Sequence, residues 1–189
     1  MASAFGPQPV LFHVVLAGAG GSPAAPDLAD LESTFHQLTT LFRVAWAVSD
    51  EDTLRIEAQF RDRFPRGTGG ESLLQWRFGA AATPLPQLRS LTMQSTVELL
   101  SEVPPEFLAS RGAVAALAVL AERVFDLPLQ ARANQEVLRA ERARWEAGRT
   151  SSELAVLTQQ SESLTALAPQ HLQMRRLELV AAPERPAAP

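Results

Sequence analysis

Residues 111–125 read RGAVAALAVLAERVF, and the rest of the chain has to be arranged around this stretch. Its large apolar side chains recur at helical spacing, which predicts a helix. Ala113–Ala121 contains no polar side chain. A helix that is apolar all round is buried on every side, or it faces a membrane or another chain. Burial in the chain's own core is the favoured interpretation, with an interface or a membrane surface as the alternatives.

Two more helices and a strand are predicted downstream of this stretch. The first helix is rich in arginine and glutamate and covers about residues 129–147. The second begins at Thr150, which is followed three positions later by a glutamate, as in a capping box. A final strand is predicted over residues 172–180, where a break in the alternation at Arg175-Arg176 indicates a bulge or a sheet edge.

The N-terminal half is predicted to contain strands and one helix. Val10–Leu16 is apolar on both faces, as expected for a central strand. Asp27 is predicted to cap a helix that runs to about Val48. Residues 53–61 show the clearest strand pattern, because apolar and polar side chains alternate along them. Further strands are predicted over residues 73–78, as the hairpin partner of 53–61, and over residues 87–94.

The segment after these strands is ambiguous. Ser95–Glu98 matches a helix capping box and predicts a short helix through Leu100, while continuation of a strand is the alternative. Pro104-Pro105 ends the segment, and Pro105 suits the first turn of another helix.

The order of these elements defines the fold class. One helix follows the first strand, more strands come next, and helices precede a last strand. This order lacks regular β-α-β alternation and therefore indicates an α+β fold. The expected fold has a small mixed sheet of about five strands, one N-terminal helix and a C-terminal portion of about three to four helices. The last strand is expected to return to the sheet, because a lone strand leaves its backbone unpaired. The expected organisation is a flexible N-terminus (1–9), an α/β portion (10–95), a helical portion (96–168), the returning strand (170–180) and a disordered Pro/Ala tail (181–189).

Composition excludes several kinds of catalytic site. All 17 basic residues are arginine, and the chain has no cysteine. Lysine-dependent phosphate loops, Schiff bases and acylation sites are therefore excluded. Thiol nucleophiles, disulfides and thiolate metal sites are excluded too. The net charge of −4 gives no general attraction to polyanions. The preference for Ala, Arg, Pro and Leu is typical of a genome rich in G and C.

Possible metal and cofactor motifs are weak, and no cofactor or metal site is predicted. Gly18–Pro23 follows a strand but lacks the last glycine and the adjoining helix of a dinucleotide loop. His13 and His36 could meet across the core, but neither they nor His171 show metal-ligand spacing, so structural roles are favoured. The acidic run at residues 50–52 is interpreted as a solvated turn.

The charged helix carries several arginines that could form a nucleic-acid-binding surface. Arg132, Arg139, Arg142 and Arg149 fall on one side of it when the residues are placed at helical spacing. Glutamates lie on or beside the same arc, which favours a solvated helix with internal ion pairs. Nucleic-acid binding is therefore not expected.

The surplus of large apolar residues in the helical half predicts its function. We expect a cytoplasmic, non-enzymatic interaction or assembly protein that binds a protein partner or a second copy through residues 111–167. The alternatives are a membrane-associated accessory or effector protein that docks through residues 111–125, and an enzyme with an unrecognised site of Asp, Glu, His and Arg. Leu91–Leu100, followed by proline, an apolar helix and a charged helix, resembles an arrangement in small bacterial proteins and implies no activity. The predicted contact residues are Leu117, Leu120, Val124, Phe125, Leu138, Trp145, Leu154, Leu157 and Leu164.

Overall fold

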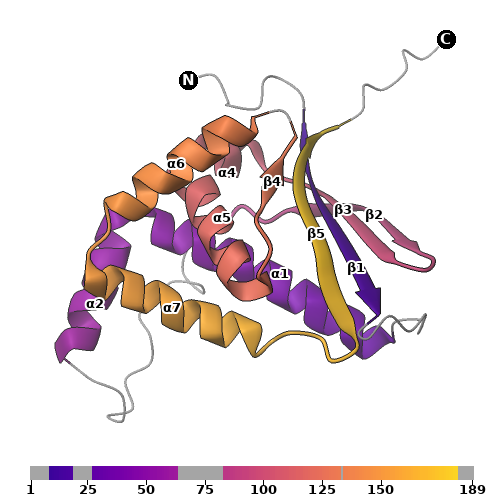
Figure 1. Cartoon of the computed structure of the whole chain (residues 1–189), viewed down its shortest axis with the longest axis horizontal. Helices are drawn as coiled ribbons and strands as arrows, with labels where there is room; N and C mark the ends of the chain where they lie inside the picture. The colour runs from indigo at the N-terminus through magenta and orange to yellow at the C-terminus, as the bar shows by residue number, and fades with distance from the viewer. Residues whose placement is uncertain (1–8, 19–26, 64–82, 133, 183–189) are drawn as a thin grey trace.

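The protein is an α+β fold in which helices gather on one side of a mixed sheet (Figure 1). The computed structural model describes residues 9–18, 27–63, 83–132 and 134–182. The sheet has five strands in the order β2-β3-β1-β5-β4, all antiparallel except the pair β4–β5. The strands are β1 (Val10–Gly18), β2 (Gln87–Met93), β3 (Val97–Glu102), β4 (Gln130–Ala131) and β5 (Leu172–Ala181). The helices are α1 (Leu28–Ser49), α2 (Glu51–Arg63), α4 (Pro105–Ala109), α5 (Arg111–Phe125), α6 (Gln135–Ala147) and α7 (Ser151–Thr165).

Strand β1 lies at the centre of the sheet and presents one fully buried face to the helices. Its buried residues alternate along the strand, from Val10 to Leu16. Phe12 meets Phe42 of α1 edge to face at 5.1 Å between ring centroids, and Phe42 lies 5.0 Å from Phe107 of α4. Because side chains alternate between the two faces of a strand, His13 points away from these helices.

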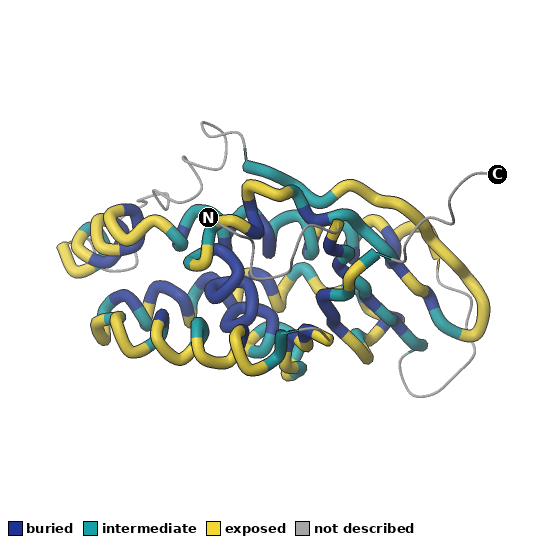
Figure 2. The backbone as a smooth tube through the Cα atoms, turned by 90° about the horizontal axis from the view of Figure 1, so that it is seen from above, coloured by how far each residue is buried: buried dark blue, intermediate teal, exposed yellow. Residues whose placement is uncertain are grey.

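Helix α5 is the core of the helical layer. Every residue from Ala113 to Ala121 is buried, which Figure 2 shows as a continuous dark-blue stretch. The helix packs against α1, α4, α6 and α7. Gly112 permits its close approach to the end of α1, since an added Cβ would lie 3.0 Å from the carbonyl oxygen of Ser49. Burial of this helix in the chain's own core is therefore confirmed.

Several elements were predicted correctly. Asp27 caps α1 by accepting a hydrogen bond from the Asp30 amide at 2.7 Å. β5 returns to the sheet and pairs with β1, as expected for a strand that would otherwise leave its backbone unpaired. The register of this pair shifts between Val15 and Leu16, so that Arg175 has no partner residue on β1 and forms the predicted bulge.

Thr150 forms the predicted capping box of α7. The Glu153 amide donates to Thr150 Oγ1 at 3.3 Å, and the Thr150 amide donates to Glu153 Oε2 at 2.7 Å. Thr150→Ala is expected to lower the free energy of unfolding by about 0.5–2 kcal/mol, because it removes the acceptor for one orphan amide of the helix. Urea unfolding followed by circular dichroism measures this loss. Thr158→Ala, an exposed position farther along α7, is the control and should change stability by less than about 0.5 kcal/mol.

The strand predicted over residues 53–61 is wrong, because these residues belong to helix α2. The acidic run interpreted as a turn is part of its beginning. Asp50 Oδ1 accepts from the Asp52 amide at 3.3 Å, and the two acidic residues that follow Asp50 lie in the first turn. Leu54 and Ala58 are buried at helical spacing, whereas Ile56 is 48% exposed.

Two other predicted boundaries are corrected. Residues 97–100 form β3 rather than a helix, and their alternate side chains Val97 and Leu99 are buried. The charged helix begins at Gln135 instead of near residue 129, because Gln130 and Ala131 pair in parallel with β5.

Some predictions lie on residues that the structure does not describe. The strand over 73–78, the glycine-rich loop after Gly18, and the N-terminus up to residue 8 belong to this group. The predicted tail is described only at its first two residues. Ala181 closes β5, and the Ala182 amide donates to the Pro9 carbonyl at 2.8 Å.

Candidate functional site

The residues predicted to contact a partner lie in the chain's own core. Leu117, Leu120 and Leu157 are at most 1% exposed, and Trp145 is 8% exposed. Leu138 and Leu164 are buried as well, whereas Val124, Phe125 and Leu154 are partly buried against the same core. Residues 113–121 of α5 are all buried, so their apolar side chains are not on the surface of the chain.

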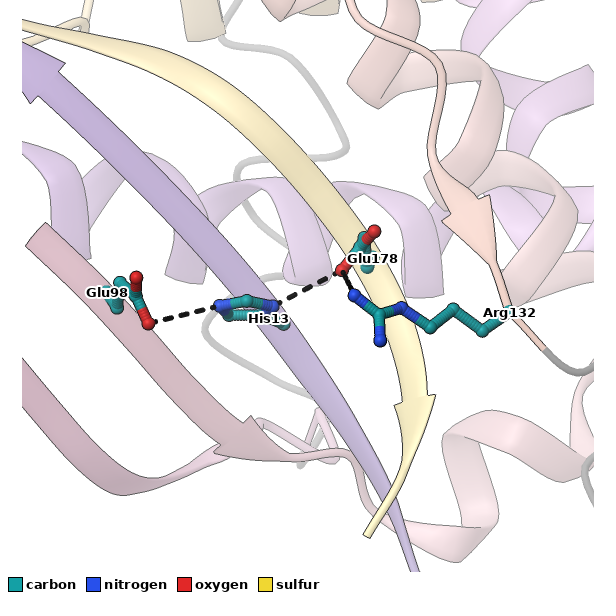
Figure 3. A network of polar contacts seen from close by, with 4 residues as sticks. All are labelled: His13, Glu98, Arg132 and Glu178. Carbon is teal, nitrogen blue, oxygen red and sulfur yellow. Dashed lines mark hydrogen bonds and ion pairs between the residues drawn. The ribbon is translucent and has the colours of Figure 1, made fainter. Parts of the chain in front are cut away.

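A polar network crosses the sheet on the face turned away from α1 (Figure 3). His13 Nδ1 lies 3.3 Å from Glu178 Oε2, and His13 Nε2 lies 3.8 Å from Glu98 Oε2. Arg132 donates from its terminal nitrogen to the same Glu178 oxygen at 3.2 Å. Glu178 has a side chain only 6% exposed, and these partners replace hydrogen bonds that it would otherwise make to water. The network ties β3, β1 and β5 to the segment after β4.

The three histidines do not meet. His13 is on the sheet face opposite α1, whereas His36 is exposed on α1 itself. His171 lies in the turn before β5, where its backbone amide donates to Asp30 Oδ1 at 3.2 Å. Among the described residues, no three His, Asp or Glu side chains are grouped in a way that could hold a metal ion.

Only two of the four arginines predicted to share one side of the charged helix, Arg139 and Arg142, lie within α6. Arg132 precedes α6, and Arg149 follows it with its guanidinium 4.6 Å from the centroid of the Trp145 ring. The structure nevertheless brings Arg132, Arg139 and Arg142 together along one cleft between β4 and α6.

Strand β2 carries three exposed apolar side chains. It forms one edge of the sheet, and all seven of its residues are exposed. Leu88, Leu91 and Met93 are 50%, 38% and 48% exposed. The sequence shows Leu91 and Met93 on one face, but it contains no sign that these side chains would be exposed.

A bulge aligns these three apolar residues. The register between β2 and β3 shifts between Leu88 and Ser90, so Leu91 pairs with Leu99 while Leu88 pairs with Ser101. Leu88 would otherwise face the opposite way from Leu91, because the two are an odd number of positions apart. With the bulge, both lie on the same side of the sheet as buried Leu99, together with Met93.

None of the helices in the described part of the chain is long and apolar enough to cross a membrane. Comparison with known proteins gives no match to a family model, to a curated protein or to a solved structure.

Proposed function

We propose that this protein is a cytoplasmic assembly protein, and that two copies join through strand β2. The observation that carries the proposal is the exposed edge of β2, where Leu88, Leu91 and Met93 form an apolar row. The free edge of a strand offers unpaired amides and carbonyls, which a second strand can satisfy. The contact surface is thus the sheet edge, in place of the helical half expected from the sequence.

A second copy is the occupant that the pattern of β2 favours. In an antiparallel pair arranged about a two-fold axis at Leu91, this residue lies beside its own copy. Met93 lies two positions after Leu91. Leu88 takes the place two positions before Leu91, because the bulged residue Arg89 is left out of the pairing. Leu88 of each copy therefore meets Met93 of the other on one face, and Ser90 meets Thr92 on the opposite face. Apolar and hydroxyl cross-strand pairs each contribute about 0.2–1 kcal/mol.

Charge does not oppose this pairing. Arg89 is the only charged residue of β2. It is already neutralised within its own chain, because its Nε donates to Glu102 Oε2 at 2.7 Å. Two copies of β2 can therefore approach without placing unpaired like charges opposite each other.

Leu91→Lys is expected to weaken the dimer about 100-fold or more. The substitution removes the apolar contact between the two copies of Leu91 and places two like charges directly opposite each other. A 100-fold change in Kd corresponds to a loss of about 2.8 kcal/mol. Sedimentation equilibrium at micromolar concentration measures the dimer. Leu28→Lys is the matched control, since Leu28 is 84% exposed but lies at the start of α1. A wild-type chain that stays monomeric would contradict the proposal.

Cysteine cross-linking tests the register itself, because the chain has no natural cysteine. Leu91→Cys should form a disulfide-linked dimer under mild oxidation, since opposed residues in an antiparallel pair lie about 4.5–5.5 Å apart between Cα atoms. Leu88→Cys alone should not cross-link, whereas a mixture of Leu88→Cys and Met93→Cys should. Equal cross-linking by all three single variants would indicate nonspecific association.

A further inference from the structure

A cleft of about 450 Å³ opens between β4, α5 and α6, at the sheet edge opposite β2. Four of its five apolar lining residues are at most 4% exposed. Exposed Pro128, two glutamines and three arginines complete the lining. The apolar residues that are buried are Ala118, Leu129, Ala131 and Leu138.

The charge of this cleft differs from that of the whole chain. The chain has a net charge of −4, yet the described residues that line the cleft include Arg132, Arg139 and Arg142 and no acidic residue. Excess positive charge beside an apolar surface favours a ligand that has a negative head and an apolar body.

The three arginines differ in how far they are already neutralised. Arg142 binds two carboxylates, those of Glu122 and Glu146. Arg132 is 64% exposed and donates one hydrogen bond to Glu178, which leaves other guanidinium donors free. Arg139 has no ion-pair or hydrogen-bond partner among the described side chains. Arg139 and Arg132 therefore retain the capacity to bind an anion.

We propose that this cleft binds an organic anion with a carboxylate or phosphate head and a short apolar body. The head is held by Arg139 and by the free donors of Arg132, because guanidinium groups match the planar donor geometry that carboxylates and phosphates require. The apolar body lies against the buried lining around Leu138. Gln135 is held toward β4, since its Oε1 accepts from the Ala131 amide at 2.5 Å, and its amide nitrogen remains a donor for the ligand.

Isothermal titration calorimetry with octanoate, octyl phosphate and octanol tests this proposal on the full chain. Octanoate, octyl phosphate or both should bind once per chain, and the tighter of the two identifies the preferred head. Octanol should bind at least about tenfold more weakly, because it lacks the charge that the arginines recognise. Saturable binding of neither anion, or equally tight binding of octanol, would overturn the proposal.

Two substitutions on α6 locate the site. Arg139→Gln should weaken binding of the anion about 10- to 100-fold, which corresponds to the loss of a charge-assisted hydrogen bond. Arg144→Gln should bind like the wild type, since Arg144 is on the same helix and 71% exposed but does not line the cleft. Unchanged affinity in Arg139→Gln would contradict the assignment. The monomeric variant Leu91→Lys should bind the anion normally, so that failure of one proposal is distinguishable from failure of the other.

Discussion

Leu157→Glu is expected to unfold the protein instead of dissociating an assembly. Leu157 is fully buried on α7, which packs against α1, α2 and α5. Loss of the leucine alone costs about 2–5 kcal/mol, and a buried carboxylate without a partner adds several kcal/mol more. The total is comparable with the whole stability of a typical domain, about 5–15 kcal/mol. Circular dichroism should show loss of helical signal at room temperature.

The neighbouring substitution Ala155→Glu is the control for this experiment. Ala155 lies on the same helix and is exposed, so a carboxylate there remains hydrated and the fold should survive. A Leu157→Glu chain that keeps its helical signal and changes only in mass would show that α7 contacts a partner after all. That outcome would restore the helical contact surface expected from the sequence.

Phe42→Ala is expected to lower the free energy of unfolding by about 3–5 kcal/mol. Phe42 is 1% exposed and its ring contacts both Phe12 and Phe107, so it joins the sheet to α1 and α4. For a chain of this size, each kcal/mol lowers Tm by about 2–4 °C, so a fall of roughly 6–20 °C should be seen by calorimetry.

Leu28→Ala is the matched control for Phe42→Ala, because Leu28 is on the same helix but 84% exposed. Its Tm should stay within about 2 °C of the wild type, since surface substitutions change stability by less than about 0.5 kcal/mol. A Phe42→Ala chain as stable as this control would contradict the packing of the three rings.

Local signals predicted those elements whose pattern fits only one kind of secondary structure. The uniformly apolar stretch of α5 and the capping residues Asp27 and Thr150 were interpreted correctly from the sequence. The returning strand β5 was also predicted, because a lone strand would leave its backbone unpaired, and its bulge appears in the sequence as a break in alternation at Arg175.

Residues 53–61 show why a short pattern can mislead. Alternating apolar residues suggested a strand, but Leu54 and Ala58 also lie four positions apart and form a buried helical stripe. Glu57 is 1% exposed in the position that strand alternation would give to solvent. Arg61 Nε donates to it at 2.9 Å, a pairing across one helical turn that a strand would not allow.

The candidate surfaces depend on how helices and strands pack against one another in three dimensions. Local sequence patterns carry no information about this packing. The many leucines of the helical half suggested an interface, yet most of them are buried in the chain's own core. The exposed row on β2 depends on its place at the sheet edge and on the bulge after Leu88. The arginine cleft depends on where α6 begins, since Arg132 lies outside that helix.

The pairing of β1 with β5 has a consequence for how the chain acquires its fold during synthesis. Residues that pair across these strands are far apart in sequence, and His13 and Glu178 are separated by 165 positions. At about 5–20 residues per second, the ribosome needs several seconds or more to make the residues between them. During this interval one side of the most apolar strand has no partner, and such unpaired strand edges promote aggregation. We therefore expect the nascent chain to depend on chaperone protection until β5 has emerged.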